Sequence, residues 1–385
     1  MTERGFRALP AADQKLILLA AGGTGGHLFP AQALAVALRA HGVRVALATD
    51  ERVASYGGDF PAESTYVIPS ATLRGSGPLA YARTIAALTL GLAKAWLLLG
   101  RLKPAAVVGF GGYPTLPPLF AAAMRGIPTV LHEQNAVMGR ANRALAARVS
   151  AIAASVPDVR LLPEALKPKV TVTGNPVRPN VIAAAAAPYG APQAGGAFRL
   201  VVFGGSQGAR VMADIVPDAV APLDAALRAR LDVVQQARGE DRARVETGYA
   251  SAGVKAEVAP FFADLPARVA QGHLVVARSG ASTVAELSAI GRPAILVPLP
   301  GALDQDQLAN ARVLEKAGGA VVIEQKDFSP QRLAAEIARL AAAPDALAAM
   351  AAAAKSAGRL DAAERLAELV LRVAGMTGLD LSPSS

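Results

Sequence analysis

Short apolar runs that end in glycine-rich turns recur along the chain. Residues 15–21 (KLILLAA) form the first run, and the chain then passes through a glycine-rich turn into an apolar helix that we expect from Pro30 to about Ala40. Residues 43–48 form the next run. Uninterrupted apolar runs of this length are typical of parallel strands that are buried on both faces. The pattern predicts the first unit of a doubly wound α/β fold.

The same order of elements returns in the second half of the chain. Residues 183–197 are rich in Ala, Pro and Gly without periodicity, which is typical of a linker. Residues 198–203 (FRLVVF) then run into a second glycine loop and a helix. We therefore expect two tandem Rossmann-like domains, residues 1–182 and 198–385, that face each other across a cleft where ligands bind. The final Ala-rich helices would cap the second domain, and the last of them could return to brace the first.

A strand, a small-residue turn and a helix follow one another after residue 272. Residues 273–277 predict a buried strand, residues 278–280 (RSG) form the turn, and Ser282 or Thr283 begins the helix. The backbone N–H groups of Ala281, Ser282 and Thr283 lie at this helix start. Together with the positive end of the helix dipole, they favour an anionic ligand.

Glu286 lies one turn into this helix. A carboxylate at that position can accept hydrogen bonds from two neighbouring hydroxyl groups, which is how a ribose is held. Alternatively, Thr283 and Glu286 form a capping box that closes the helix start. The local sequence leaves both interpretations open.

The first glycine loop, residues 22–27 (GGTGGH), could cradle a phosphate group. It does not match the dinucleotide-binding fingerprint, because His27 displaces the third glycine. His27 stands at the mouth of the following helix and is a candidate general base. Alternatively, it only bonds a neighbouring carbonyl group at the helix end.

Two later strands also end in polar groups: one in residues 132–135 (HEQN), and one shortly before Arg178, which can fix a phosphate.

Residues 78–102 carry the most unusual apolar pattern of the chain. Apolar residues recur at intervals of three and four, which predicts a helix: Tyr81, Ile85, Leu88, Leu92, Trp96 and Leu99. Leu90, Leu97 and Leu98 lie off this stripe, and basic residues surround it. The uninterrupted apolar stretches are shorter than the about 20 residues that a bilayer span needs. The segment is either a buried core helix or a helix that dips an apolar edge into a membrane while its cations meet anionic lipid.

Charge is distributed unevenly along the chain. Residues 1–182 contain 19 Lys and Arg against 9 Asp and Glu, whereas residues 183–385 contain 20 against 21. The basic first half suggests an anionic partner. Nucleic acid fits poorly, because no Lys/Arg-rich tract is present and aromatic residues make up only 4% of the chain. A membrane surface fits better.

Composition excludes several kinds of chemistry. Without cysteine, the chain has no disulfide, no thiolate nucleophile and no cysteine-ligated zinc. The four histidines lie far apart in sequence, and none forms a local metal-ligand pair. We expect neither a metal ion nor another cofactor. The polar residues before Lys15 do not resemble a secretory signal, which fits a reducing cytosol.

Several motifs, in order along the chain, resemble those of the bacterial peptidoglycan enzymes that add N-acetylglucosamine to lipid I and so form lipid II. These enzymes make up the MurG family of the glycosyltransferase-B superfamily. The motifs are GGTGGH at 22–27, LRG at 73–75, GFGGYPTLPP at 109–118, HEQN at 132–135, GNPVR at 174–178, GGSQGA at 204–209, RSGASTVAE at 278–286 and QLANA at 307–311. The resemblance extends from Lys15 to about Val373.

The resemblance implies a function in cell-wall biogenesis, cell shape and cell division. The protein would be an inverting hexosyltransferase that moves N-acetylglucosamine from UDP-N-acetylglucosamine to the C4 hydroxyl of the N-acetylmuramic acid (MurNAc) unit of lipid I. It would lie at the cytoplasmic face of the inner membrane as a peripheral protein. Its partners would be the two substrates and an anionic membrane surface, and not nucleic acid.

The resemblance also implies roles for individual residues. Thr24, Gly25 and Gly26 would lie near the acceptor diphosphate and the donor sugar, with His27 as the candidate catalytic base. Asn135 would contact the transferred sugar and is the second catalytic candidate. The donor would be held by Arg178, Ser206, Phe262 beside the uracil, Ala281, Ser282, Thr283, Glu286 at the ribose and Gln307 at the sugar.

The chain departs from the family at Asp306, where His or Gln is common, and this puts the local geometry in doubt. Asp304 and Asp306 also mimic the metal-binding carboxylate pair of another glycosyltransferase superfamily. We interpret them instead as charges that favour a helix start.

Other protein classes share parts of this pattern. A UDP-N-acetylglucosamine epimerase or a different UDP-sugar-dependent glycolipid glycosyltransferase would have the same two domains, but an epimerase has no use for the helix at 78–102. A nicotinamide-dependent oxidoreductase would use Asp50 after the second strand, yet the glycine loop before it has the wrong pattern. A non-catalytic membrane-docking module would leave the three glycine loops without a use.

Overall fold

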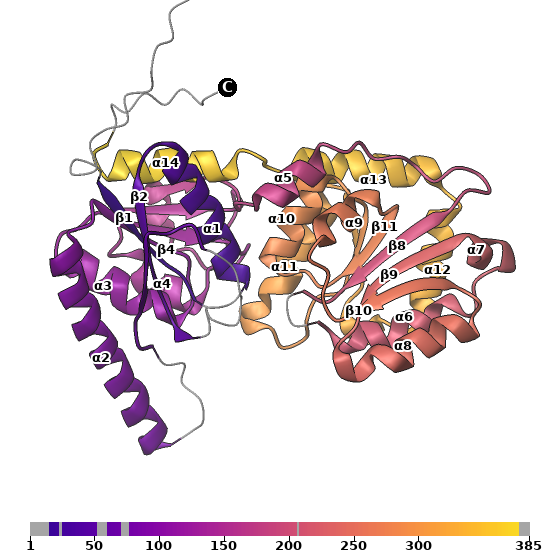
Figure 1. The fold of residues 1–385 in the computed structure, drawn as a ribbon, viewed down its shortest axis with the longest axis horizontal. Helices are drawn as coiled ribbons and strands as arrows, with labels where there is room; N and C mark the ends of the chain where they lie inside the picture. Colours follow the sequence, from indigo (N-terminus) through magenta and orange to yellow (C-terminus); the bar gives the residue numbers. More distant parts are fainter. Residues whose placement is uncertain (1–14, 23–24, 52–59, 71–76, 206–207, 377–385) are drawn as a thin grey trace, which may run out of the picture. The chain divides into compact units, whose positions relative to one another are not determined.

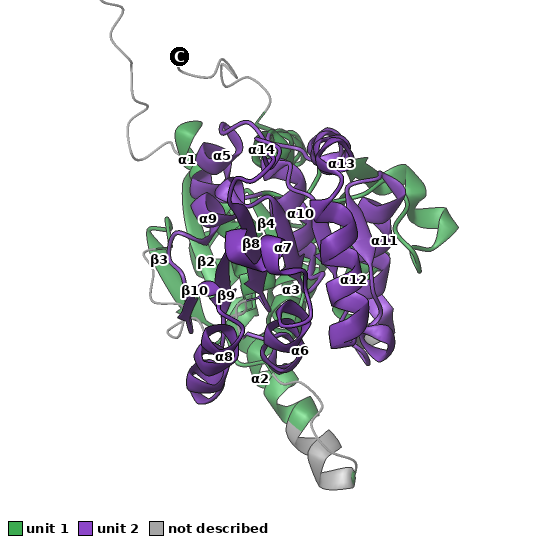
Figure 2. Ribbon diagram, turned by 90° about the vertical axis from the view of Figure 1, so that its right-hand side faces the viewer, with its two compact units in different colours: residues 1–134, 138–176, 361–385 green, residues 135–137, 177–360 purple. Residues whose placement is uncertain are grey.

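The computed structural model describes residues 15–22, 25–51, 60–70, 77–205 and 208–376, and within these ranges it does not describe the side chains of residues 78–83 and 303. Each of two compact units contains its own parallel sheet (Figures 1 and 2). Unit 1 comprises residues 1–134, 138–176 and 361–385, and unit 2 comprises residues 135–137 and 177–360. Thr24, Ser206 and the motif at 73–75 lie outside the described residues.

Unit 1 is built around a seven-stranded sheet in the order β3-β2-β1-β4-β5-β6-β7. Its elements are β1 (Leu16–Ala20), α1 (Gly25–Ala40), β2 (Arg44–Thr49), β3 (Ser64–Val67), α2 (Pro78–Leu102), β4 (Ala106–Gly109), η2 (Tyr113–Thr115), α3 (Leu116–Met124), β5 (Thr129–Glu133), α4 (Arg140–Ala146), β6 (Ala151–Ala154), η3 (Glu164–Lys169), β7 (Val170–Val172) and α14 (Ala362–Val373).

Unit 2 repeats this plan with a six-stranded sheet in the order β10-β9-β8-β11-β12-β13. Its elements are α5 (Pro179–Ala185), β8 (Phe198–Phe203), α6 (Arg210–Val220), α7 (Ala225–Arg230), β9 (Leu231–Gln236), α8 (Gly239–Ser251), β10 (Lys255–Ala259), α9 (Leu265–Gln271), β11 (Leu274–Ala277), α10 (Ala281–Ile290), β12 (Ala294–Leu296), η4 (Leu303–Gln305), α11 (Asp306–Lys316), β13 (Ala320–Val322), η5 (Gln325–Asp327), α12 (Pro330–Ala341) and α13 (Pro344–Ala357).

The central strands are buried on both faces, as their apolar runs predict. Every residue of β1, β4 and β11 is buried, and separate hydrophobic clusters form on the two faces of each sheet. All strand pairs are parallel. The strand order reverses between β1 and β4 in unit 1 and between β8 and β11 in unit 2. These reversals are the switch points where open α/β sheets bind ligands. The predicted α/β class with two Rossmann-like domains is confirmed.

The boundaries between the two units lie at other sequence positions than those expected from composition. They divide after Pro176 and after Leu360, whereas the sequence analysis divided the chain at residues 182 and 198. The reason lies in α5, whose Val181 and Ala185 are buried in the core of unit 2. The last helix, α14, packs along α1 in unit 1 (Figure 1).

Two helices begin earlier than expected. The helix predicted from Pro30 begins at Gly25, so that Pro30 lies inside α1 and His27 lies in its first turn. The helix expected to begin at Ser282 or Thr283 begins at Ala281. In both cases the glycine turn is shorter than the sequence pattern implied, and the helix follows the strand almost directly.

The helix predicted at 78–102 is present as α2, but its expected apolar stripe is not all buried. Ala95 and Leu99 face the core, whereas Ile85 of the stripe is 63% exposed, and Leu90 and Leu97 are 52% and 71% exposed. Residues Thr84–Leu102, 19 in number with a mean hydropathy of 1.5, are long and apolar enough to cross a membrane by length and composition. Lys94 and Arg101 lie within this range, so the uninterrupted apolar stretches are short, as expected from the sequence. Residues Pro330–Ala341 and Pro344–Val373, bent by 97°, meet the same criterion only as a pair.

Candidate active site

Arg178 and Glu286 form an ion pair at the start of two packed helices in unit 2. Arg178 is the N-cap residue of α5, Glu286 lies in α10, and the two helices are in contact. The Arg178 Nη2 atom lies 3.2 Å from the Glu286 Oε1 atom, and the two side chains are only 23% and 16% exposed. Burial raises the pKa of Glu286, and the Arg178 charge opposes this rise. The pair combines a carboxylate, which can accept hydrogen bonds from hydroxyl groups, with a guanidinium group, which can bind phosphate.

The alternative interpretation of Glu286 as part of a capping box is wrong. The N-cap residue of α10 is Gly280, which has no side chain to cap the helix. Thr283 is buried, and the Glu286 carboxylate is engaged by Arg178 instead. The hydroxyl group of Ser282 is also buried and has no hydrogen-bond partner among the described residues. The first turn of α10 therefore holds a buried polar group that the helix itself does not use.

Side-chain hydrogen bonds fix the turn that precedes α10. The buried Arg278 side chain donates to the carbonyl groups of Val297 and Pro298, at 3.1 and 3.0 Å. The Ser279 hydroxyl donates to the carbonyl group of Gln307 at 2.8 Å, and the Gln307 Oε1 atom accepts from the backbone N–H of Leu299 at 3.1 Å. Gln307, expected at the donor sugar, is thus fixed beside the turn that leads to Glu286.

The chain turns sharply before α11. Asp304 and Gln305 both adopt left-handed backbone conformations, with φ of 55° and 56°, which are strained for residues other than glycine. The Asp306 carboxylate accepts from the backbone N–H of Gln307 at 2.7 Å, so it serves the helix start, although the N-cap residue is Gln305. Burial raises the pKa of Asp306, and Asp304 adds to the rise.

In unit 1, His27 lies at the switch point between β1 and β4. Its ring packs against the second glycine turn so closely that a Cβ atom on Gly112 would lie 3.4 Å from the His27 Nε2 atom. Gly111 and Gly112 have φ of 83° and 74°, so a side chain at either position would also strain the backbone. The glycine turn after β4 therefore leaves space for the imidazole ring, next to Gly25 and Gly26 in the first turn of α1.

His132, at the end of β5, is fully buried. Its Nε2 atom lies 3.1 Å from the Gly174 carbonyl oxygen, and its Nδ1 atom lies 2.9 Å from the Gln134 Nε2 atom. This arrangement requires a neutral ring that donates from Nε2 and accepts at Nδ1. Burial lowers the pKa of His132 to about 4, the Gly174 carbonyl opposes this, and the charge of His27 adds to it.

Three buried amide side chains were not singled out by the sequence analysis: Asn142 and Asn175 in unit 1 and Asn310 in unit 2. Asn142 donates to the Glu133 carboxylate at 2.7 Å. Asn175 is 7% exposed, and neither its Nδ2 nor its Oδ1 atom has a partner among the described residues. Asn310 bonds Asn135, which is one of the two predicted catalytic residues, at 3.0 Å. Two of these amides lie within the motifs GNPVR and QLANA, which is the sequence signal that could have found them. A buried amide without a ligand or partner is costly.

Phe262 is buried next to α9, where the Arg268 guanidinium carbon lies 4.5 Å from the centre of its ring. Its neighbour Phe261 is 70% exposed.

The structure brings Arg178, Glu286 and the first turn of α10 together in unit 2, and it places His27 near the glycine turn of unit 1. Among the described residues, no group of three or more His, Asp and Glu could hold a metal ion.

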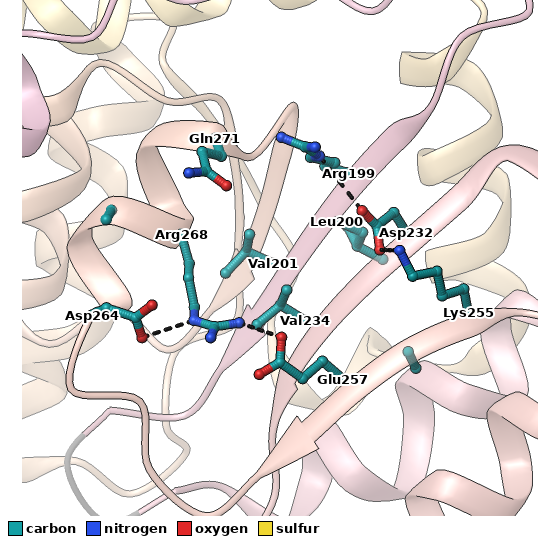
Figure 3. Close-up of a pocket in the computed structure, with 12 residues that line it drawn as sticks. Arg199, Leu200, Val201, Asp232, Val234, Lys255, Glu257, Asp264, Arg268 and Gln271 are labelled. Carbon is teal, nitrogen blue, oxygen red and sulfur yellow. Dashed lines mark hydrogen bonds and ion pairs between the residues drawn. The ribbon is translucent and has the colours of Figure 1, made fainter.

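A separate cavity of about 310 Å³ opens over the first halves of β8, β9 and β10 (Figure 3). None of the predicted site residues lines it. Its charged side chains pair with one another, for example Arg199 with Asp232 at 3.5 Å and Arg268 with Asp264 at 2.8 Å. The cavity lies away from the carboxyl ends of the strands, where the candidate site is found.

Two Rossmann-like units, with Arg178 and Glu286 paired at one switch point, define a protein of the glycosyltransferase-B fold. The chain belongs to glycosyltransferase family 28: the N-terminal domain of this family matches residues 17–154, and the C-terminal domain matches residues 199–366. The resemblance noted in the sequence is confirmed, and the protein is a glycosyltransferase.

Curated relatives match almost the whole chain. The UDP-N-acetylglucosamine--N-acetylmuramyl-(pentapeptide) pyrophosphoryl-undecaprenol N-acetylglucosamine transferase of Rhodopseudomonas palustris (strain BisB18) is 62% identical over 94% of this chain and 96% of its own length. The enzyme of the same name from Bradyrhizobium diazoefficiens is 60% identical over 94% of this chain and 99% of its own length.

Solved structures share the fold. The crystal structure of Acinetobacter baumannii MurG matches with a TM-score of 0.75 and 27% identity, and the match covers 93% of this chain and 99% of that one. A UDP-GlcNAc 2-epimerase from Neisseria meningitidis matches with a TM-score of 0.64 over 93% of this chain and 100% of that one. At 14% identity, the epimerase shows a shared fold alone.

Proposed function

We propose that this protein transfers N-acetylglucosamine from UDP-N-acetylglucosamine to the N-acetylmuramyl-(pentapeptide) pyrophosphoryl-undecaprenol acceptor, lipid I, and so forms lipid II for peptidoglycan. The observation that carries this proposal is 62% identity over 94% of the chain to an enzyme with that name. The Arg178–Glu286 pair at the switch point of unit 2 supplies the groups that a UDP-sugar needs.

The donor would bind at the carboxyl edge of the unit 2 sheet. Glu286 would accept hydrogen bonds from the ribose hydroxyls, and Arg178 would hold the diphosphate. The backbone N–H groups of Ala281, Ser282 and Thr283 and the loop containing Ser206 would stabilise negative charge on the leaving UDP. Phe262 would lie near the uracil, and Gln307 and Asn135 would contact the sugar.

The acceptor would bind at the carboxyl edge of the unit 1 sheet, with its diphosphate near Thr24, Gly25 and Gly26. The C4 hydroxyl of its MurNAc unit attacks C1 of N-acetylglucosamine, and the bond from C1 to the diphosphate oxygen breaks. His27 takes the hydroxyl proton, and UDP leaves with the electron pair. A single displacement of this kind inverts the configuration at C1, and it needs a base on one side and charge stabilisation on the other.

A transfer assay with the full-length protein tests this function. The protein is supplied with UDP-N-acetylglucosamine and a lipid I analogue, with UDP-glucose and UDP-N-acetylgalactosamine as competing donors. The expected product is the disaccharide lipid from UDP-N-acetylglucosamine. Conversion of UDP-N-acetylglucosamine to its 2-epimer without any acceptor would instead support the epimerase alternative, and transfer to other glycolipids alone would support a different glycosyltransferase.

We also propose that α2 docks unit 1 on the cytoplasmic face of the inner membrane, where a polyprenyl-linked acceptor resides. One side of α2 is fixed to unit 1, because Ala95 and Leu99 are buried and the helix packs on α3. The other side exposes Leu90 and Leu97 and the cations Lys94 and Arg101. Each cation near an anionic surface contributes about 1 kcal/mol, and an inserted apolar edge adds binding that salt does not screen.

Vesicle sedimentation tests the membrane proposal. Wild-type protein should bind vesicles that contain anionic lipid and bind neutral vesicles less well. Lys94→Glu with Arg101→Glu should weaken binding without changing UDP affinity, whereas Lys316→Glu with Lys326→Glu, two exposed cations of unit 2, should leave it unchanged. Wild-type protein that stays in the supernatant at low salt would contradict the proposal.

A further inference from the structure

We propose that Asn310 is a positioning residue for the transferred sugar, because it fixes the orientation of the Asn135 amide. Asn310 lies on α11 and is 4% exposed. The inference rests on the proposed function, in which Asn135 contacts the donor sugar.

Asn310 makes three hydrogen bonds to protein groups of unit 2. Its Oδ1 atom accepts from the backbone N–H of Ala136 at 2.8 Å, and its Nδ2 atom donates to the Asn135 Oδ1 atom at 3.0 Å and to the Ser279 carbonyl oxygen at 3.3 Å. Ser279 belongs to the turn that leads into α10 and Glu286. Asn310 therefore ties Asn135 to the same turn that begins the proposed nucleotide site.

The backbone groups determine the orientation of both amides. The N–H of Ala136 can only donate and the carbonyl of Ser279 can only accept, so the Oδ1 and Nδ2 atoms of Asn310 cannot exchange places. Because Asn310 presents a donor to Asn135, Asn135 must present its Oδ1 atom in return. The Asn135 side chain is thereby held in one of its two amide orientations, and its donor group lies on the side away from Asn310.

Asn310→Asp tests this role with little change of shape. The aspartate can still accept from Ala136, but it offers no donor to Asn135, so the Asn135 amide is expected to turn over and reverse its donor and acceptor. The weaker bond to the Ser279 carbonyl is also lost, but the bonds of Arg278 to Val297 and Pro298 and of Ser279 to Gln307 still hold that turn. We expect kcat/KM for UDP-N-acetylglucosamine to fall about tenfold or more, since one misplaced hydrogen bond is worth roughly that factor. The dissociation constant of UDP, which has no sugar, should stay within about twofold of wild type.

Two comparisons separate positioning from general damage. Lys316→Ala makes the same change in net charge at an exposed position of the same helix, and it should leave kcat/KM unchanged. In an Asn135→Ala background, Asn310→Asp should have little further effect on kcat/KM, because the residue acts through Asn135. A purely structural role would instead lower activity equally in both backgrounds and weaken UDP binding.

If Asn310→Asp does not fold, Asn310→Ser removes the amide without adding charge. It should lower kcat/KM in the wild-type background and have little further effect in the Asn135→Ala background. Wild-type-like kcat/KM in a folded variant, or equal losses with and without Asn135, would overturn the inference while leaving the proposed function intact. A wild-type protein that transfers no sugar from UDP-N-acetylglucosamine would overturn the proposed function itself, and this inference with it.

Discussion

Glu286 has an ionic partner before any ligand binds, and this partner explains how a buried carboxylate is tolerated in unit 2. Removing the charge of one member leaves the other in a site that is less than a quarter exposed. Such a pair contributes little to stability by itself, because desolvation offsets the attraction. In the proposed function, the pair holds the two groups that would bind the donor in fixed positions.

Glu286→Ala should weaken UDP binding by about 1.5–3 kcal/mol, the usual range for hydrogen bonds that involve a charged group. Because burial raises the pKa of Glu286, the wild-type carboxylate should lose its charge, and UDP affinity should fall, at a higher pH than for an exposed glutamate. Calorimetry with UDP across the acidic range measures both effects. Glu286→Gln is the control and should lack this pH dependence; unchanged affinity in Glu286→Ala would remove the residue from the site.

In the proposed mechanism His27 is the base, and it lies in the first turn of α1 against the second glycine turn. His27→Ala should reduce turnover by about 10²–10⁴-fold, the usual contribution of general acid–base catalysis. UDP affinity should not change, since the proposed nucleotide site is in unit 2. Steady-state kinetics and calorimetry on the same preparation separate the two quantities, and a variant within a few-fold of wild type would leave the base unassigned.

His132 should make unit 1 less stable in mild acid. Its folded pKa of about 4 lies below the ordinary value of 6.5. Between these values the unfolded chain binds a proton that the folded protein does not, so stability is present above pH 6.5 and is lost as the pH falls towards 4. The loss for this one group is about 3 kcal/mol.

His132→Gln isolates this contribution. At pH 7 the variant should be less stable than wild type, and the difference in unfolding free energy should shrink as the pH falls from 6.5 to 4. Urea unfolding followed by hydrogen exchange at β5 provides the measurement. A difference that stays constant with pH would mean that His132 does not remain neutral in the folded protein.

At the scale of elements, Gly91 allows α2 to pack closely against the rest of unit 1. A Cβ atom on Gly91 would lie 2.1 Å from the carbonyl oxygen of Pro69 and 3.2 Å from a ring carbon of Pro117. Gly91→Ala should therefore force the helix outwards and destabilise unit 1 by about 1–3 kcal/mol. Thermal unfolding measures the effect, with Ala93→Gly, an exposed position of the same helix, as a contrasting variant in which no contact is strained. Unchanged stability in Gly91→Ala would show that α2 is not packed this tightly.

The strands were the elements best predicted from sequence, and helix starts the least well. Short apolar runs bounded by turn residues, such as that of β1, are typical of strands buried on both faces. The start of α1 depends on how few residues the glycine turn needs. The prediction placed the start at Pro30 because proline favours the first turn of a helix, whereas Pro30 lies inside α1. The burial of α2 also depends on which neighbours cover it, and periodicity cannot show this.

Only the part of the candidate site that lies at strand ends could be predicted from the sequence. Groups at strand ends, such as His27, Arg178 and Glu286, follow from the rule that ligands bind at the carboxyl edge of a parallel sheet. The network of Asn310 with Asn135 joins residues 175 positions apart in sequence, and no local pattern links them. The choice between a capping box and a ligand-binding carboxylate also needed the position of Arg178, which lies on a different helix.

At the scale of the whole molecule, the last helix belongs to the unit that begins the chain. Residues 361–385 group with unit 1, and Leu366, Leu369, Val370 and Leu371 of α14 are buried in its core with residues of α1. His41, just after α1, lies 2.9 Å from the Glu364 carboxylate. Unit 1 is therefore incomplete until the end of the chain has been made, whereas the described core of unit 2 is drawn from residues 177–354.

A chain that ends at residue 360 should consequently lose the fold of unit 1 and keep that of unit 2. Full burial of a leucine or valine stabilises by about 1.5–3 kcal/mol, so four such residues contribute roughly 6–12 kcal/mol. This is comparable with the total stability of about 5–15 kcal/mol that a domain has. Hydrogen exchange should show β1 unprotected and β8 protected, and calorimetry should still detect UDP binding. A chain that ends at residue 376 keeps α14 and should behave as wild type in both measurements. Protected β1 amides in the shorter chain would mean that α14 only covers a unit that is already stable without it.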